Sequence, residues 1–93
     1  MIKDYLLKGH ENGRTLEELE ILTGKPGRII RRQINEERRD TIILNLQDGQ
    51  GYFLPDAGEA DLVRRWVKQE ESRLKLHALS LRAGRQALRE EQQ

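Results

Sequence analysis

The chain has 93 residues, which is enough for one small domain that can fold alone. It contains no cysteine, so disulfide bonds and thiolate metal sites are excluded. Apolar residues and charged residues each make up 35% of the chain, and the hydrophobic core must therefore be thin. The net charge is only +1, so any preference for nucleic acid must come from how the charges are distributed along the chain.

The N-terminal segment predicts a short helix followed by a polar turn. Residues 2–8 have apolar side chains at helical spacing, and Gly9 would end the helix. The polar residues 10–14 come next and contain Asn-Gly, which is a strong turn signal. The two histidines, His10 and His77, make no metal-binding pattern, and we expect one in this turn and the other on a helix surface.

A helix is expected over residues 16–22, because clear start and stop signals frame it. Thr15 is followed three residues later by Glu18, which is a capping box in which each side chain accepts the other residue's backbone N–H. Gly24 ends the helix, since glycine adopts the left-handed conformation without steric cost. Pro26 suits the first turn of a second helix, so a tight turn joins the two.

The second helix, over residues 26–38, is rich in arginine. Ile30 and Ile34 lie four residues apart and stack on one side. Between residues 25 and 39 there are six basic side chains and two acidic ones. The pair of helices predicts a helix-turn-helix, in which the second helix lies in the major groove of DNA.

A β-hairpin is expected after these helices. Residues 41–46 are β-branched and apolar, and residues 52–54 form a second run of this kind. The turn-forming residues 47–51 between them have Asp-Gly at their centre. The predicted fold class is therefore mainly α with a β-hairpin, a winged helix-turn-helix domain over residues 1–56.

Residues 57–93 predict one long C-terminal helix. Its bulky early residues are expected to pack on the domain, and four apolar residues then recur every seven positions: Val67, Leu74, Leu81 and Leu88. The seam positions between them, Glu70, His77 and Gly84, are poor for a coiled coil. The distal half therefore projects, frays or pairs with a second copy of the chain to form a homodimer.

Two short runs resemble a known family of DNA-binding domains. Residues 30–34 read Ile-Arg-Arg-Gln-Ile, and residues 49–55 read Gly-Gln-Gly-Tyr-Phe-Leu-Pro. Over residues 3–56 the chain resembles the N-terminal winged-helix domain of the bifunctional biotin operon repressor/biotin ligases, and also small winged-helix proteins of phages and prophages. Glu37 departs from the pattern, which usually has a buried leucine there, and Thr41 stands in place of a glycine. The resemblance implies double-stranded DNA binding, and without a ligase domain it implies no biotin chemistry.

The expected DNA contacts are mainly arginines, whose planar guanidinium can donate two hydrogen bonds to a guanine edge or to a phosphate. We expect the main contacts from Arg28, Arg31 and Arg32, and secondary ones from Lys25, Asn35 and, in the hairpin loop, Gln50. The alternative is a solvated helix face whose ion pairs contribute little to stability.

Taken together, the sequence favours sequence-specific binding of double-stranded DNA by a small transcriptional regulator of phage or prophage type. We expect it in the cytoplasm of a bacterial or phage-infected host cell, because no apolar run approaches the ~18 residues of a membrane span. An alternative is a protein-interaction adaptor or scaffold that uses the C-terminal helix and does not bind DNA. We expect no enzyme activity, cofactor, metal or small-molecule ligand, because neither a nucleophile–histidine spacing nor a phosphate-binding glycine loop is present.

Overall fold

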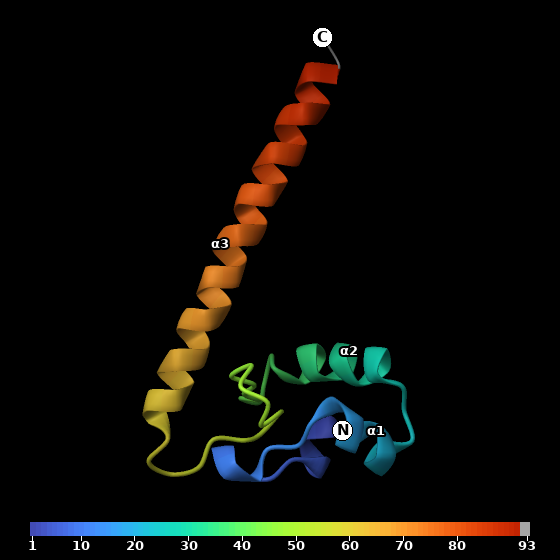
Figure 1. The fold of residues 1–93 in the computed structure, drawn as a ribbon, viewed down its shortest axis with the longest axis vertical. Helices are drawn as coiled ribbons and strands as arrows, with labels where there is room; N and C mark the ends of the chain where they lie inside the picture. The colour runs from blue at the N-terminus through green and yellow to red at the C-terminus, as the bar shows by residue number, and fades with distance from the viewer. Residues whose placement is uncertain (92–93) are drawn as a thin grey trace.

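The computed structural model describes residues 1–91. Two 3₁₀ turns and two short helices form a small body, and one long helix rises from it (Figure 1). The longest dimension is 54 Å. In chain order the elements are η1 (Ile2–Tyr5), η2 (His10–Asn12), α1 (Leu16–Thr23), α2 (Gly27–Glu37) and α3 (Ala60–Glu91).

The two central helices and the turn between them form where the sequence predicts them. The hydroxyl of Thr15 accepts the N–H of Glu18 at 3.2 Å, and the Glu18 carboxylate accepts the N–H of Thr15 at 3.3 Å. Gly24 follows α1 in the left-handed conformation at φ 70°, and its N–H donates to the Glu20 carbonyl. Pro26 directly precedes α2, which places the start of this helix one residue later than predicted.

The core consists of two clusters of buried residues. The first lies between η1, α1 and α2 and contains Ile2, Leu6, Leu19, Ile30, Ile34 and Ile43. The second is made by Leu44, Leu46 and Phe53 and is covered by Leu62, Val63 and Trp66 of α3. The early part of the C-terminal helix therefore packs on the domain, as its bulky residues predict.

The predicted β-hairpin is wrong, and the winged-helix fold class is wrong with it. Residues 1–91 contain no strand and no sheet, only three isolated bridges. Phe53 exchanges both backbone hydrogen bonds with Leu44, at 2.9 and 3.0 Å. Its neighbour Tyr52 instead exchanges two with Arg14, and Leu54 bonds to the backbone of residues 7 and 9.

The physical reason is that the second apolar run is shared among three different segments. Successive residues of an extended chain direct their N–H and C=O groups to opposite edges. Tyr52 and Leu54 therefore bond to residues before α1, and only Phe53 between them bonds to Leu44. On the other side, the Asn45 side chain accepts the N–H of Gln47, and Gln47 has a positive φ of 60°. The chain therefore turns away from an extended course by Gln47. Residues 45–51, here the 45–51 loop, form a loop and not a wing.

The N-terminal helix is also shorter than predicted, because the chain is already extended at Leu6 and residues 7 and 9 pair with Leu54. Only Ile2–Tyr5 are helical, and as a 3₁₀ turn. The carboxylate of Glu37 accepts the N–H groups of Ile2 and Lys3, both at 2.8 Å, while Glu37 itself is only 8% exposed. These two bonds supply hydrogen-bond donors to the carboxylate of Glu37 in its buried position.

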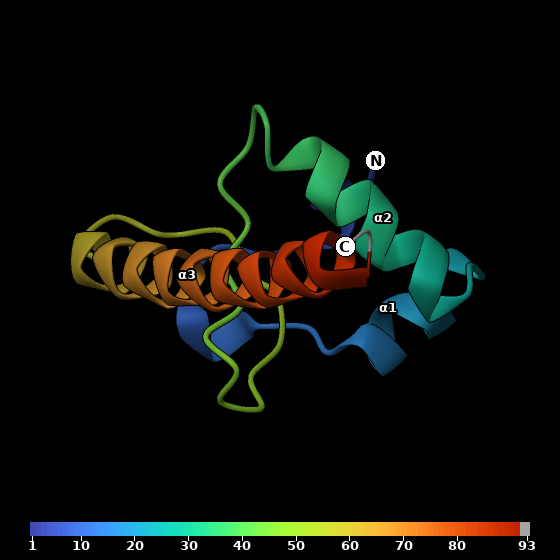
Figure 2. The same cartoon turned by 90° about the horizontal axis from the view of Figure 1, so that it is seen from above.

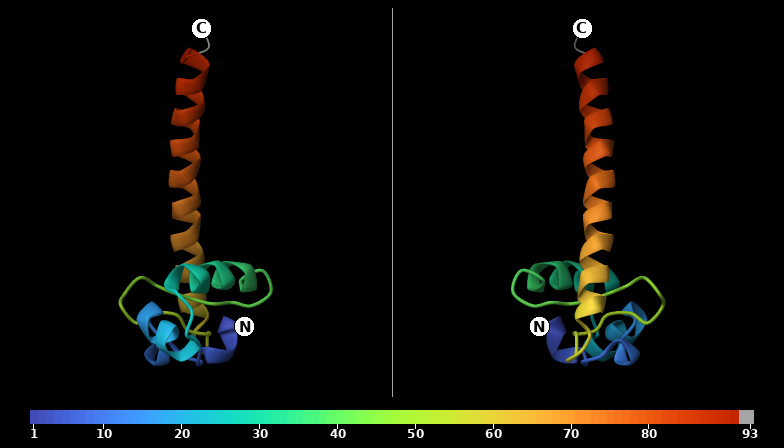
Figure 3. Two further views of the ribbon diagram at one scale, coloured as in Figure 1. Left: turned by 90° about the vertical axis from the view of Figure 1, so that its right-hand side faces the viewer. Right: turned by 90° about the vertical axis from the view of Figure 1, so that its left-hand side faces the viewer.

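Helix α3 leaves the body and projects away from it (Figure 3). It begins at Ala60, three residues after the predicted boundary, and every residue from Glu71 to Glu91 is exposed. Residues 92 and 93, which the prediction includes in the helix, lie outside the described residues. Within residues 1–91, no helix has both the length and the apolar character needed to cross a membrane.

Candidate nucleic-acid interface

Four of the predicted contact residues share the outer face of α2. Arg28, Arg31, Arg32 and Asn35 are all exposed, whereas Ile30 and Ile34 on the opposite face are 0% and 1% exposed. Their spacing by three and four residues places the four side chains on one side of the helix. Within residues 1–91, no hydrogen bond or ion pair ties any of these four side chains to another group. We call this surface the α2 arginine face.

Lys25 and Gln50 are not part of the α2 arginine face. Lys25 is exposed in the turn before α2, but its ammonium donates to the Gln33 side chain at 3.2 Å and so lies along a flank of the helix. Gln50 is exposed in the 45–51 loop, with its backbone packed against Gly13. The structure thus brings together four of the six predicted contact residues.

The 45–51 loop is held at its tip by a hydrogen bond between His10 and Asp48. The ring nitrogen Nε2 of His10 lies 2.5 Å from a carboxylate oxygen of Asp48. Burial raises the pKa of Asp48, but hydrogen bonds from the Gln50 N–H and from His10 outweigh this, and the net pKa lies below the usual range. Asp48 is therefore anionic at neutral pH, and its charge would repel a phosphate near the loop tip.

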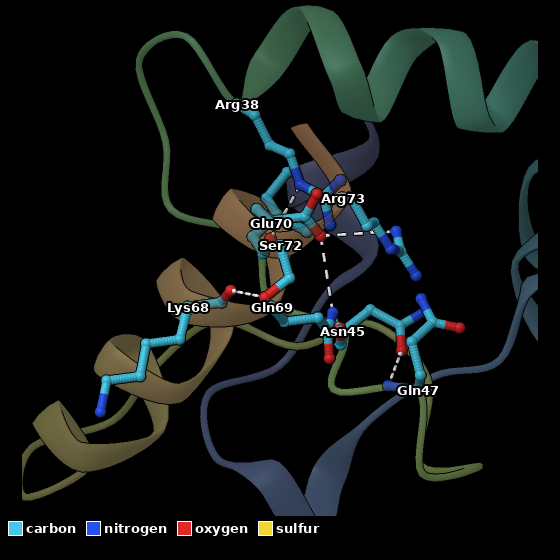
Figure 4. A network of polar contacts seen from close by, with 9 residues as sticks. Arg38, Asn45, Gln47, Lys68, Gln69, Glu70, Ser72 and Arg73 are labelled. Carbon is cyan, nitrogen blue, oxygen red and sulfur yellow. Dashed lines mark hydrogen bonds and ion pairs between the residues drawn. The ribbon is translucent and has the colours of Figure 1, made fainter. Parts of the chain in front are cut away.

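Beside the α2 arginine face, the structure forms a concave site that the sequence does not predict. It lies between α2, the 45–51 loop and residues 62–73 of α3, which we call the foot of α3. Its volume is about 520 Å³. Three arginines from different parts of the chain line it, Arg31, Arg38 and Arg73, together with the amide side chains of Asn35, Asn45 and Gln47. Figure 4 shows Arg38 reaching from the end of α2 toward Glu70, with the Arg73 guanidinium beside Gln47. We call this site the α2–α3 hollow.

Arg38 is the most firmly held of these arginines. Its Nε donates to the Ile43 carbonyl at 2.9 Å, and its guanidinium lies over the rings of Trp66 and Tyr52, 5.2 and 5.9 Å from their centroids. Burial lowers the pKa of Arg38, and the negative charge of Glu70 partly counters this effect. Arginine remains protonated in proteins in any case, so Arg38 supplies a fixed positive charge to the α2–α3 hollow.

The foot of α3 is tied to the 45–51 loop, which makes them one wall of the hollow. The Gln69 side chain donates to the Asn45 carbonyl at 2.9 Å (Figure 4). Arg73 and Glu70, which both line the hollow, form an ion pair at 3.5 Å. Glu70 is the one acidic residue lining the hollow, so the three arginines leave it with an excess of positive charge.

Arg38, Arg73, Asn45 and Gln47 are residues of this site that the sequence analysis did not assign. Arg73 is distant in sequence from α2, and only the packing of α3 brings it close. The available signal was Trp66, a large apolar residue early in the helix, which the sequence analysis placed against the domain. That signal fixes where α3 docks but not which of its side chains face α2.

Comparisons of the chain with protein-family models, with curated proteins and with solved structures gave no match. Residues 1–91 also contain no group of three or more His, Cys, Asp and Glu side chains placed to hold a metal ion.

Proposed function

We propose that the protein binds double-stranded DNA through the α2 arginine face. The observation that supports this is the placement of Arg28, Arg31, Arg32 and Asn35 together on one uncovered side of a helix. The opposite side is anchored in the core by Ile30 and Ile34, so the face is presented on a rigid element. An α-helix fits the B-DNA major groove, which is about 12 Å wide.

The side chains suit different parts of the duplex. Arg28 and Arg31 stand near the start of α2, from where side chains of a recognition helix usually reach base edges. An arginine can bind guanine O6 and N7 together, and Asn35 can do the same with adenine N6 and N7. Arg32 lies at the edge of the face, where a contact to phosphate is expected. The 45–51 loop has no part in this proposal, because it forms no wing.

The proposed biological role is that of a small, sequence-specific transcriptional regulator of phage or prophage type, acting in the bacterial cytoplasm. This finer assignment rests on the resemblance of residues 30–34 and 49–55 to such proteins. Selection of bound duplexes from a random pool would test it. A regulator yields a defined motif, whereas enrichment of no motif would contradict sequence-specific binding.

The proposal is tested by duplex binding measured with fluorescence anisotropy. Arg28→Ala and Arg32→Ala are expected to weaken binding about tenfold each, since a good base contact or charged hydrogen bond is worth ~1–3 kcal/mol. Arg65→Ala is the matched control, because Arg65 is an exposed arginine on α3 outside both surfaces. Equal binding by all three variants and the wild type would contradict the assignment.

The second candidate function is protein interaction through α3, which the apolar stripe on its projecting part favours. Leu74, Leu81 and Leu88 are spaced by seven residues and are 69%, 57% and 61% exposed. An isolated helix without packing is only marginally stable in water, and a partner that buries this stripe would stabilise it. We propose that the partner is α3 of a second copy of the chain.

The charges beside the stripe favour a parallel arrangement of the two copies. One flank carries four basic residues at seven-residue spacing: Lys68, Lys75, Arg82 and Arg89. In an antiparallel pair the basic flanks of the two helices would face and repel each other, whereas in a parallel pair they lie on opposite sides of the interface.

A parallel pair would also carry two α2 helices at the same end, as binding to two half-sites about 34 Å apart requires. If a different protein covers the stripe instead, the chain would serve as an adaptor or scaffold that need not bind DNA.

A further inference from the structure

We infer that the α2–α3 hollow binds a phosphodiester group of the same duplex that α2 contacts, so that α3 takes part in DNA binding through Arg73. This inference rests on the proposed function of α2 and extends it to a second element. It assigns a DNA contact to a helix whose remaining exposed residues suggest only protein interaction.

The chemistry of the hollow suits an oxyanion. A guanidinium group can donate two parallel hydrogen bonds to phosphate oxygens. Three guanidinium side chains line the hollow: one from α2, one from the residue just after it and one from α3. The Nε of Arg38 is used by the Ile43 carbonyl, which leaves its two terminal nitrogens as donors. Asn35, Asn45 and Gln47 add neutral amide donors around the same space.

The position of the hollow makes a DNA backbone the fitting ligand. Arg31 belongs both to the α2 arginine face and to the lining of the hollow, so the two surfaces are continuous. A strand that borders the groove occupied by α2 would therefore pass across the hollow. Helix α3 rises beside α2 (Figures 1 and 2), and its residues Glu70 and Arg73 line the hollow, so it would flank this strand.

A phosphate contact of this kind positions the duplex without reading its sequence. Arg73 is suited to this role because it is exposed and tied only by the 3.5 Å ion pair with Glu70. Exposed pairs contribute little to stability, so replacing Arg73 should leave the fold intact. The effect of the substitution on binding can then be attributed to the lost contact.

The experiment measures binding of wild type, Arg73→Ala, Arg73→Lys and Arg65→Ala to two unrelated duplexes across a series of salt concentrations. Arg73→Ala is expected to weaken binding to both duplexes by the same factor, about fivefold, and to reduce the slope of log K against log salt by about one. Arg73→Lys keeps the charge and should keep the slope. Arg65→Ala is the control on the same helix, because Arg65 is exposed and lies outside the hollow.

The failure of this inference is distinguishable from the failure of the proposed function. If Arg28→Ala and Arg32→Ala lose affinity while Arg73→Ala binds like the wild type, the hollow takes no phosphate. The inference is then overturned, and the proposed function of α2 stands. A loss confined to one of the two duplexes would also overturn it, because that pattern indicates a base contact. If the wild type binds neither duplex in a salt-dependent way, the proposed function fails and the inference fails with it.

Discussion

The guanidinium of Arg38 lies 5.2 Å from the centroid of the Trp66 ring, and this contact joins the end of α2 to the foot of α3. The same side chain donates to the Ile43 carbonyl, so one residue links α2, the segment after it and the long helix. The relative position of α2 and α3, on which the hollow depends, is therefore fixed by side chains that are themselves partly buried.

Replacing Arg38 should weaken this link. Arg38→Met keeps most of the aliphatic stem but removes the hydrogen bond and the cation–π contacts, which together are worth about 2 kcal/mol of the free energy of unfolding. Urea denaturation can be followed by tryptophan fluorescence, because Trp66 is the only tryptophan in the chain. Arg39→Met alters the exposed neighbour and should have little effect; equal stability of the two variants would contradict the role of Arg38.

The buried carboxylate of Glu37 should be one of the most sensitive positions in the domain. Glu37→Ala leaves the N–H groups of Ile2 and Lys3 without their acceptor, and hydrogen bonds to charged groups are worth ~1.5–3 kcal/mol each. We expect a loss of about 3 kcal/mol in the free energy of unfolding. The adjacent Glu36 is exposed, and Glu36→Ala should be nearly neutral. A neutral Glu37→Ala would show that the N-terminal turn is held by other contacts.

Two glycines of the 45–51 loop allow a direct test of how this loop is held. Gly49 and Gly51 have similar positive φ angles, 87° and 85°, so alanine at either position has the same backbone strain. A methyl group at Gly51 would overlap the Arg14 carbonyl, whereas one at Gly49 meets no atom within 4 Å. Gly51→Ala is therefore expected to cost about 2 kcal/mol more than Gly49→Ala in thermal or urea unfolding. Equal costs would mean that the loop does not pack on residue 14.

If two chains pair through α3, replacing two leucines of similar exposure should have different effects on the oligomeric state. Leu81 belongs to the stripe and is 57% exposed, while Leu79 lies on another side of the helix and is 55% exposed. Leu81→Lys should convert a dimer to a monomer in sedimentation velocity, and Leu79→Lys should not. A wild-type protein that sediments as a monomer at every concentration would exclude the pairing.

The features that the sequence predicted correctly depend on residues close together in the chain. The capping box of Thr15 and Glu18, the end of α1 at Gly24 and the buried pair of isoleucines in α2 each involve positions within four residues of one another. The outward direction of Arg28, Arg31 and Arg32 follows from that isoleucine pair, because the opposite side of a helix must face solvent.

The features that the sequence did not predict depend on partners far along the chain. Alternating apolar residues with Asp-Gly between them fit a hairpin, but Tyr52 pairs with Arg14, and no local signal indicates this. The buried state of Glu37 likewise depends on backbone N–H groups 34 and 35 residues away. The contribution of Arg73 to the hollow requires the orientation of α3, which its own heptad spacing does not specify.

The central claim, that the α2 arginine face binds duplex DNA, is tested most directly by measuring the affinity of the unaltered protein for a 20-base-pair duplex at increasing salt. If Arg32 and the hollow each take one phosphate, log K should fall linearly with log salt, with a slope of roughly −0.9 for each phosphate neutralised and about −2 in total. Affinity that is absent at low salt, or that does not change as salt rises, would contradict the account.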